Sequence, residues 1–292
     1  MKNKNLLRTL IFLSTVFQVC NSYAQEPTKP DVASYIDYFN KAVFQQTQNG
    51  VPYVFRWNTE LGVCQFGNYS STDDQAMRGF IKFLNSSTIL NLTVFDKNDI
   101  KNCSNDDTIF LRWHDGKDGG KNVISNDILF LGDLTGRYLN IPAEKFNMKG
   151  MGLYSFGSYY RPYMYVSLSG VGRGNIDPDI QRTTEIVQKP LYGALTGIQN
   201  EFSRKYDTFL SDPLFSLSDQ FKIKYSDRRI NLCRFDVITL LVLYGKKQSG
   251  VPTKMPMDYY KKFIETNYHE LLKESDSLMN NPNYSHIFLR KC

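Results

Sequence analysis

The stretch DPDIQRTTEIVQKPLYGALTG, residues 177–197, predicts the central helix of the fold. Asp177 is a typical N-cap residue, and Pro178 stands in the first turn, where proline is tolerated. Apolar residues then recur at helical spacing, at Val187, Leu191, Ala194 and Ile198. Pro190 lies inside this pattern and predicts a kink, and Gly197 is placed to end the helix.

The segments around this helix alternate between helical and strand-like patterns. Helical spacing predicts one helix from Asp31, stopped by Asn49-Gly50, and three others that begin at Ser71, Phe235 and Asp258. Alternating or continuous apolar runs predict strands over residues 54–66, 91–95, 108–113, 128–131 and 163–168. The sequence contains no internal repeat and no clear linker, so this order predicts a single α+β domain.

Residues 150–170 are unusually rich in aromatic side chains. Six tyrosine and phenylalanine residues fall in this short stretch, at Tyr154, Phe156, Tyr159, Tyr160, Tyr163 and Tyr165. Aromatic residues are favoured in strands, so we interpret the stretch as a β-hairpin whose rings cover the core. The alternative is an aromatic platform that binds a glycan or a peptide, with Tyr159, Tyr160 and Tyr163 in the groove.

The first 24 residues have the pattern of a cleavable secretory signal peptide. Lys2, Lys4 and Arg8 precede a short apolar run over residues 10–19, and Ser22-Tyr23-Ala24 offers small residues for cleavage. The run is shorter than the roughly 20 apolar residues that span a membrane. A lipid anchor on Cys20 is the alternative. No later segment is apolar enough to span a membrane, so we expect the mature protein in the periplasm or outside the cell, without an integral membrane segment.

The charge of the chain does not favour nucleic acid as a partner. The full chain has a formal net charge of +6, and removal of the signal peptide leaves about +3 by the same count. Lysine and arginine are scattered, and no run of them forms a stripe that follows a phosphate backbone. We therefore predict an ordinary solvated surface.

Four cysteines remain after signal cleavage: Cys64, Cys103, Cys233 and Cys292. An even number of cysteines in an oxidising compartment suggests two disulfides, although four cysteines allow three pairings. We favour Cys64–Cys103, which would tie a strand to the loop beyond the next helix, and Cys233–Cys292, which would fix the C-terminus. A metal site is the alternative, but the sequence has no C-x-x-C spacing.

The order of these elements resembles that of the zincin metallopeptidases. The parts that carry the resemblance are a strand with Arg56-Trp57, a kinked helix that ends in Ala194-Leu195-Thr196-Gly197, and the later segment FDVITLLVLY, residues 235–244. More closely, the chain resembles a family of exported proteobacterial proteins, a domain of unknown function with zincin-like order. The resemblance covers roughly residues 54–245. It implies a zincin-like domain over residues 51–292, after a polar leader and helix over 25–50, in which a mixed sheet packs on the kinked helix, with C-terminal helices beyond.

In such proteins the active helix carries the motif H-E-x-x-H. Two histidines at positions i and i+4 bind zinc, and the glutamate activates the metal-bound water. Alignment on the Ala-Leu-Thr-Gly end places Gln188 and Tyr192 at the histidine positions and Lys189 at the glutamate position. Glutamine and tyrosine are poor zinc ligands, and a lysine repels the metal. The resemblance therefore implies a non-catalytic protein with no metal and no cofactor.

The other candidates for chemistry are weak. His114-Asp115 is a pair that orients a serine nucleophile in some hydrolases, but no G-x-S-x-G motif accompanies it. His269-Glu270 resembles the start of a zinc motif, but Lys273 occupies the place of the second histidine, so we predict a surface helix. The glycines of residues 170–174 lack the spacing of a phosphate-binding loop and predict a turn.

These observations leave three hypotheses of function. The first is a non-catalytic binding or accessory protein of the bacterial envelope, with a peptide, a glycan or an envelope protein as its partner, held in a groove beside Gln188 and Tyr192. The second is a hydrolase with an unrecognised active site that includes His114. The third is a secreted factor that acts on other cells.

Overall fold

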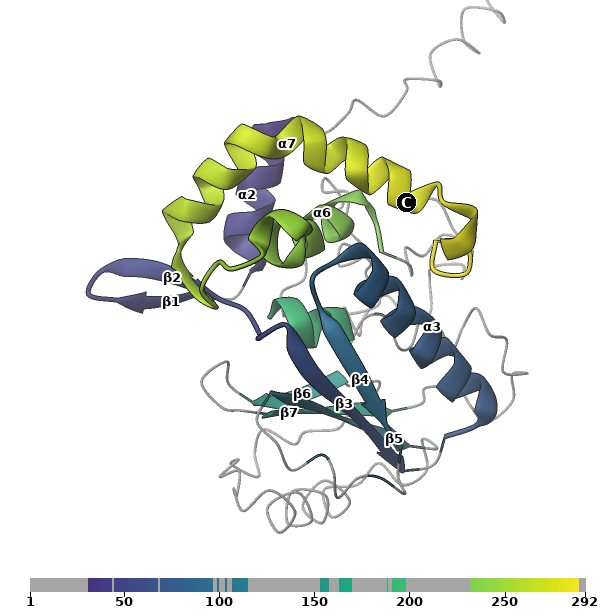
Figure 1. Cartoon of the computed structure of the whole chain (residues 1–292). Coiled ribbons are helices and arrows are strands. Elements are labelled where there is room, and N and C mark those ends of the chain that lie inside the picture. Colours follow the sequence, from purple (N-terminus) through teal and green to yellow (C-terminus); the bar gives the residue numbers. More distant parts are fainter. Residues whose placement is uncertain are drawn as a thin grey trace, which may run out of the picture. The chain divides into compact units, whose positions relative to one another are not determined.

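The structure is a computed structural model that describes residues 31–43, 45–67, 69–96, 99, 103, 107–114, 153–157, 163–169, 188, 191–197 and 232–288. The chain divides into two units, Met1–Asp31 and Val32–Cys292. The predicted signal peptide belongs to the first unit and lies outside the described residues. The second unit contains all the helices and strands labelled in Figure 1.

The N-terminal part of this unit is a helix followed by a hairpin. Helix α2 spans Val32–Ala42, and strands β1 (Gln45–Gln48) and β2 (Val51–Phe55) pair antiparallel. Asn49 and Gly50 have φ angles of 52° and 79°, which is the left-handed pair that a tight two-residue hairpin turn requires. The sequence predicted Asn49-Gly50 only as the end of the helix. A third strand, β8 (Lys254–Pro256), completes this small sheet on the other side of β2.

The strand predicted over residues 54–66 is two strands in two different sheets. Strand β2 ends at Phe55, and β3 begins at Glu60. Between them, the backbone N–H of Arg56 donates to the Thr253 carbonyl (2.9 Å), and that of Trp57 donates to the Tyr244 hydroxyl (3.0 Å). These two bonds pair the backbone N–H groups of Arg56 and Trp57 with partners outside both sheets. The chain can therefore leave the first sheet here before it enters the second. Periodicity does not reveal such partners, because they lie far away in the sequence.

The larger sheet has five strands in the order β4-β3-β5-β7-β6. Strands β3 (Glu60–Gly67), β4 (Asn91–Phe95), β5 (Thr108–His114) and β7 (Tyr163–Ser169) are parallel, and β6 (Leu153–Gly157) pairs antiparallel with β7. The predicted mixed sheet and the predicted β6–β7 hairpin are therefore both present. The strand predicted at 128–131 lies outside the described residues.

Helix α3 (Ser71–Ser87) connects β3 to the parallel strand β4. Ser70 and Asp73 cap its first turn reciprocally: the Asp73 N–H donates to the Ser70 hydroxyl oxygen (3.2 Å), and the Ser70 N–H donates to an Asp73 carboxylate oxygen (2.7 Å). Near the other end, the Asn85 side chain forms two hydrogen bonds with the backbone of Leu92 in β4. The helix is thereby fixed beside β4 (Figure 1).

The C-terminal part is helical. Helix α6 (Arg234–Tyr244) is buried from Phe235 to Tyr244, which identifies it as a core helix, and α7 (Met257–Met279) buries one side only. Residues 191–196 are helical, and Gly197 follows with a φ of 72°, as expected for the predicted helix end. Buried residues of α2, α3, the larger sheet, residues 191–195, α6 and α7 form one hydrophobic core.

This arrangement confirms an α+β fold. No helix within the described residues has the length and apolarity needed to cross a membrane. The large core is built from segments far apart in the chain, so the position of any functional side chain depends on how these segments meet.

Candidate functional site

Gln188 stands at the position of the first zinc-binding histidine in the motif suggested by the resemblance. Its side chain is fully buried. The amide nitrogen donates to the carbonyl oxygen of Ile287 (3.1 Å), and the amide oxygen accepts from the N–H of Leu232 (3.3 Å). Gln188 therefore joins the residues before α6 to the C-terminal segment, and both polar ends of its side chain are used in the interior.

Tyr192 stands at the position of the second histidine and is also fully buried. Burial raises the pKa of its hydroxyl well above the usual value of 10.0, and the nearby Tyr38 and Asp236 raise it further. The Tyr192 hydroxyl is influenced electrostatically by Tyr38 and Asp236, and the Tyr38 hydroxyl donates to Asp236 Oδ1 (3.2 Å). Tyr192 is therefore a neutral, buried side chain beside an interior hydrogen-bond network.

The same network joins helices α2 and α6. Asp236 is the N3 residue of α6, and its Oδ2 accepts from the N–H of Cys233 (2.8 Å), so the carboxylate also caps that helix. On the next turn of α6, the hydroxyls of Thr239 and Tyr35 are hydrogen-bonded at 2.9 Å. All these side chains are fully buried. These hydrogen bonds hold α2 and α6 together, and the buried Tyr192 of the segment at 191–196 lies near them.

The sequence predicts a ligand groove beside two residues, Gln188 and Tyr192. Both side chains have an exposed fraction of 0%, so neither can contact a ligand that arrives from solvent. Within the described residues, no three His, Cys, Asp or Glu side chains gather in a way that could hold a metal ion.

The remaining predicted site residues are placed in part. Lys189, Tyr159 and Tyr160 lie outside the described residues, and Tyr163 is placed only as the first residue of β7, opposite Thr108 of β5. His114 is the last residue of β5, and its register partner is Ser169 at the end of β7. His269 is exposed on α7, as the sequence predicted.

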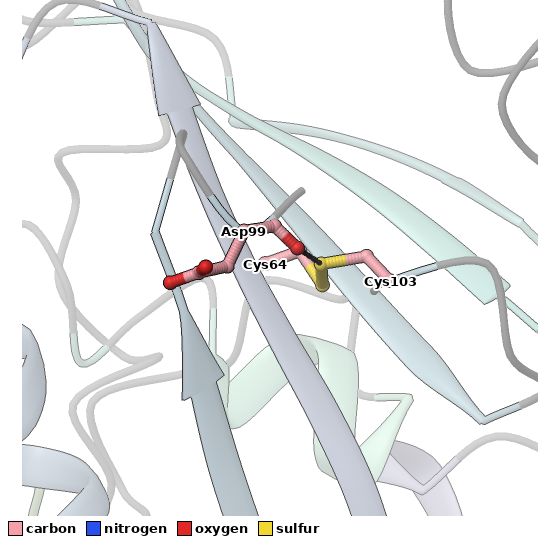
Figure 2. Close-up of a disulfide and its surroundings, with 3 residues drawn as sticks. All are labelled: Cys64, Asp99 and Cys103. Carbon is pink, nitrogen blue, oxygen red and sulfur yellow. Dashed lines mark hydrogen bonds between the residues drawn. A yellow bond between two sulfur atoms is a disulfide. The ribbon is translucent and has the colours of Figure 1, made fainter. Parts of the chain in front are cut away.

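The sequence predicts two disulfides, Cys64–Cys103 and Cys233–Cys292. Cys64 in β3 and Cys103 form a disulfide, in which both residues are buried (Figure 2). Cys233 is disulfide-bonded as well, while its predicted partner Cys292 lies outside the described residues. The first disulfide ties the connection between β4 and β5 to the middle of the sheet.

A second polar group lies where strands β3 and β4 end, and the sequence analysis did not single it out. We call Gln65, Asp74, Arg78 and Asp96 the carboxyl-edge network. Arg78 Nε donates to both carboxylate oxygens of Asp74 (2.9 Å each), and its Nη2 donates to both oxygens of Asp96 (2.8 and 2.9 Å). The Gln65 amide nitrogen donates to both aspartates.

The carboxyl-edge network differs from the interior one in its contact with solvent. The side chains of Asp74, Arg78 and Asp96 are 31%, 43% and 40% exposed, whereas Gln65 is buried beneath them and accepts a hydrogen bond from the Trp113 indole (3.3 Å). The hydrogen bond to Asp74 is the main cause that raises the pKa of Arg78. Two carboxylates surround one guanidinium, so the group has a net charge of −1 and keeps free acceptor positions for hydroxyl or ammonium donors.

The strand order makes this edge of the sheet a candidate ligand-binding site. Strand β3 lies between β4 and β5, so the chain that leaves β3 through α3 pairs on one side of it and then returns to pair on the other. In open parallel sheets, ligands bind outside the carboxyl ends of the strands at such a change of direction. The sequence shows Asp74 only as an acid in a first helical turn and Asp96 only as a loop residue. The parallel pairing of β3 with β4 brings them together.

Comparisons of the chain with protein-family models, with curated proteins and with solved structures found no significant match. The function must therefore be argued from the geometry of the two polar networks.

Proposed function

We propose that this chain is an exported, non-catalytic binding or accessory protein of the bacterial envelope, built on a scaffold that resembles a degenerate zincin. One observation carries the proposal. The side chains at the two zinc-ligand positions that the resemblance implies, Gln188 and Tyr192, are fully buried, and Gln188 makes two interior hydrogen bonds.

A catalytic zinc site needs the opposite arrangement. Its ligands face a cavity in which one coordination position stays open for water or substrate. Gln188 instead forms hydrogen bonds with Ile287 and Leu232, and Tyr192 is fully buried near Tyr38 and Asp236. These bonds stabilise the fold and support a scaffold that has been adapted away from zinc-peptidase chemistry.

The carboxyl-edge network is the best-supported place for a ligand. It combines half-exposed carboxylates with a buried amide at a change of strand direction. Its free acceptors suit the hydroxyl groups of a glycan or the ammonium groups of a peptide. A peptide or a glycan of the envelope is therefore the ligand class that we propose.

The proposed compartment is the periplasm. The N-terminal sequence has the pattern of a secretory signal, and the Cys64–Cys103 disulfide fits an oxidising environment. Cell fractionation tests this, because the mature protein in the culture medium would favour a secreted factor, and the protein in the periplasm would favour an envelope component.

The zinc part of the proposal is tested by metal analysis of protein purified from the periplasm without chelators. We expect no stoichiometric zinc and no peptide hydrolysis. The triple variant Gln188→His, Lys189→Glu, Tyr192→His restores the motif letters, and we expect it to be less stable than the parent and still inactive. One zinc per chain in the unaltered protein would overturn the proposal.

The ligand part is tested with a library of envelope oligosaccharides and peptides. Arg78→Ala and Asp96→Asn should reduce retention of a bound ligand by at least about tenfold, which is about 1.4 kcal/mol. Lys247→Ala is the matched control, because it removes an exposed ion pair with Glu270 on a different part of the fold. If Lys247→Ala and Arg78→Ala reduced ligand retention equally, the carboxyl edge would be rejected as the binding site.

A hydrolase is the second candidate, and the register of the sheet favours it specifically. His114 and Ser169 end neighbouring parallel strands and are register partners at the same carboxyl edge. A histidine and a serine at one edge of a sheet are residue types that can supply a base and a nucleophile. Any esterase or peptidase activity found in the protein should disappear in both His114→Ala and Ser169→Ala, whereas loss in neither would exclude this pair.

A further inference from the structure

The two edge strands of the small sheet, β1 and β8, differ in how they are protected. The strand order is β1-β2-β8, so among the described residues neither β1 nor β8 has a strand on its outer side. Strand β8 contains Lys254 and Pro256, and lysine and proline on an edge oppose the addition of another strand. Strand β1 has the sequence QQTQ, with no charge and no proline, and its register with β2 is continuous. The edge at β1 is therefore chemically open to strand pairing.

A proline in β2 determines which backbone groups of β1 face outward. Thr47 of β1 is the register partner of Pro52. Proline has no N–H to donate, so this pair is of the kind that exchanges no hydrogen bonds and whose backbone groups point away from each other. The N–H and C=O of Thr47 therefore point to the outer edge. Those of Gln45 do so as well, because the direction alternates along a strand.

The hairpin that carries this edge is accessible. Thr47 and Gln48 are exposed, and Val51 has an exposed fraction of 41%. At the tip, a Cβ atom placed on Gly50 would meet nothing within 4 Å beyond its own chain neighbours. Figure 1 shows the hairpin projecting past the helices. In the part of the chain that the structure describes, another strand can thus reach β1 without a rearrangement of the fold.

The side chains of β1 favour a second copy of this chain as the partner. In an antiparallel pairing about a twofold axis, Gln45 of each copy lies opposite Thr47 of the other, and both residues direct their backbone groups to the partner. Gln46 then lies opposite itself. An amide side chain has both donors and an acceptor, so two facing glutamines can satisfy each other. A strand of a different sequence would gain the backbone bonds but not this match.

The absence of charge in β1 matters for the same reason. The full chain has a formal net charge of +6, so two copies repel each other weakly at long range. Like charges directly opposite each other in a sheet are destabilising. None of the residues Gln45–Gln48 is charged, so no such contact arises where the two strands meet.

We propose that β1 is a homodimerisation edge, at which two copies of the chain pair their β1 strands antiparallel about a twofold axis at Gln46. The pairing joins the two small sheets into one continuous sheet. A four-residue strand makes a contact well below the standard interface of about 1,600 Å². The dimer is therefore weak, with a dissociation constant between about 10 μM and 1 mM. It does not depend on the proposed binding function.

The experiment is sedimentation equilibrium of the protein purified from the periplasm, at concentrations up to about 1 mM. Gln46→Lys and Gln46→Glu each place like charges on the axis, so each alone should raise the dissociation constant at least about tenfold. An equimolar mixture of these two variants should associate again, because lysine then faces glutamate. Thr266→Lys on the exposed side of α7 adds the same charge elsewhere and should leave the association unchanged.

A second variant tests the backbone bonds. Thr47→Pro removes an outward N–H that the β1–β2 hairpin does not use, and proline is tolerated on an edge strand in this orientation. It should weaken the dimer at least about tenfold and leave the thermal unfolding of the dilute protein unchanged. This variant also decides the proposal if the Gln46 variants fail to fold, which circular dichroism checks.

Three results would overturn the proposal. The first is a protein that stays monomeric at about 1 mM. The second is a dimer that Gln46→Lys and Thr47→Pro do not weaken, since the contact would then lie elsewhere. The third is a mixture of the lysine and glutamate variants that does not associate although the unaltered protein does, because Gln46 would then not face itself. An equal loss with Thr266→Lys would assign the effect to net charge and would likewise reject the edge.

Discussion

The interior network around Tyr192 and the carboxyl-edge network around Arg78 use similar polar groups in opposite ways. In the first, tyrosine hydroxyls, an aspartate and a threonine are fully buried between helices. In the second, two aspartates and an arginine retain 31% to 43% of their side-chain exposure. The comparison shows that burial decides whether a polar side chain stabilises the fold or can bind a ligand. An enclosed polar group stabilises the fold, because an unsatisfied partner in the interior is costly, while a half-exposed one remains available to a ligand.

Alkaline pH should break the interior network and leave the carboxyl edge with little direct effect. Burial raises the pKa of Tyr35 and Tyr192 well above 10.0, and that of Tyr260 to about 12. A raised folded-state pKa gives stability that is present below about pH 10 and is lost as pH rises further, because the unfolded chain ionises first. Each such tyrosine costs about 1.4 kcal/mol per pH unit, so we expect a loss of about 4 kcal/mol at pH 11. Chemical unfolding monitored by circular dichroism at several pH values measures this loss of stability. Phenolate absorbance, recorded in parallel, measures the ionisation of the tyrosines. Ionisation of every tyrosine of the chain before any unfolding would contradict the buried assignment.

Removal of the Cys64–Cys103 disulfide should weaken the carboxyl edge more than the interior network. The bond closes a loop of 39 residues, for which the chain-entropy estimate is about 4 kcal/mol. Cys64→Ala/Cys103→Ala should lower the free energy of unfolding by about that amount. Hydrogen exchange should rise first around Gln65 and Asp96 and last in α6. Uniform exchange throughout the chain would show that the two networks unfold as one unit.

Gln188→Ala should be more costly than an ordinary surface substitution. It leaves the Leu232 N–H and the Ile287 carbonyl without their partner in a buried position. Each unsatisfied group costs about 1–3 kcal/mol, so we expect about 3 kcal/mol in urea unfolding. The control is Gln46→Ala on the hairpin strand β1, at a position that is only partly buried. A difference below about 1 kcal/mol between the two variants would reject a structural role for Gln188.

Arg78→Ala should have the smallest effect on stability and the largest on binding. The ion pairs of Arg78 are partly exposed, and such pairs typically contribute less than about 1 kcal/mol. We expect a shift in urea midpoint that is barely measurable, together with the loss of ligand retention described above. A large loss of stability without a loss of binding would show that Arg78 has a structural role, as the interior residues do. The two networks would then not differ in function.

Much of the local structure follows from sequence pattern. The helices at 32–42, 71–87, 234–244 and 257–279 and the strands at 91–95, 108–114 and 163–169 lie where apolar spacing predicts them. The split of residues 54–66 into β2 and β3 was missed, because the bonds that turn the chain come from Tyr244 and Thr253. The hairpin strand β1 was missed as well, since its residues Gln45–Gln48 carry no apolar alternation.

The sequence by itself determined the local elements, the presence of four cysteines after residue 24, and the identity of the residues at Gln188, Lys189 and Tyr192. Only the tertiary structure decided what Gln188 and Tyr192 do and which polar residues share the carboxyl edge. The physical reason is the sequence separation over which the interactions act. Periodicity and capping act between residues within one or two turns, whereas burial and hydrogen-bond partners depend on segments that are distant in the chain.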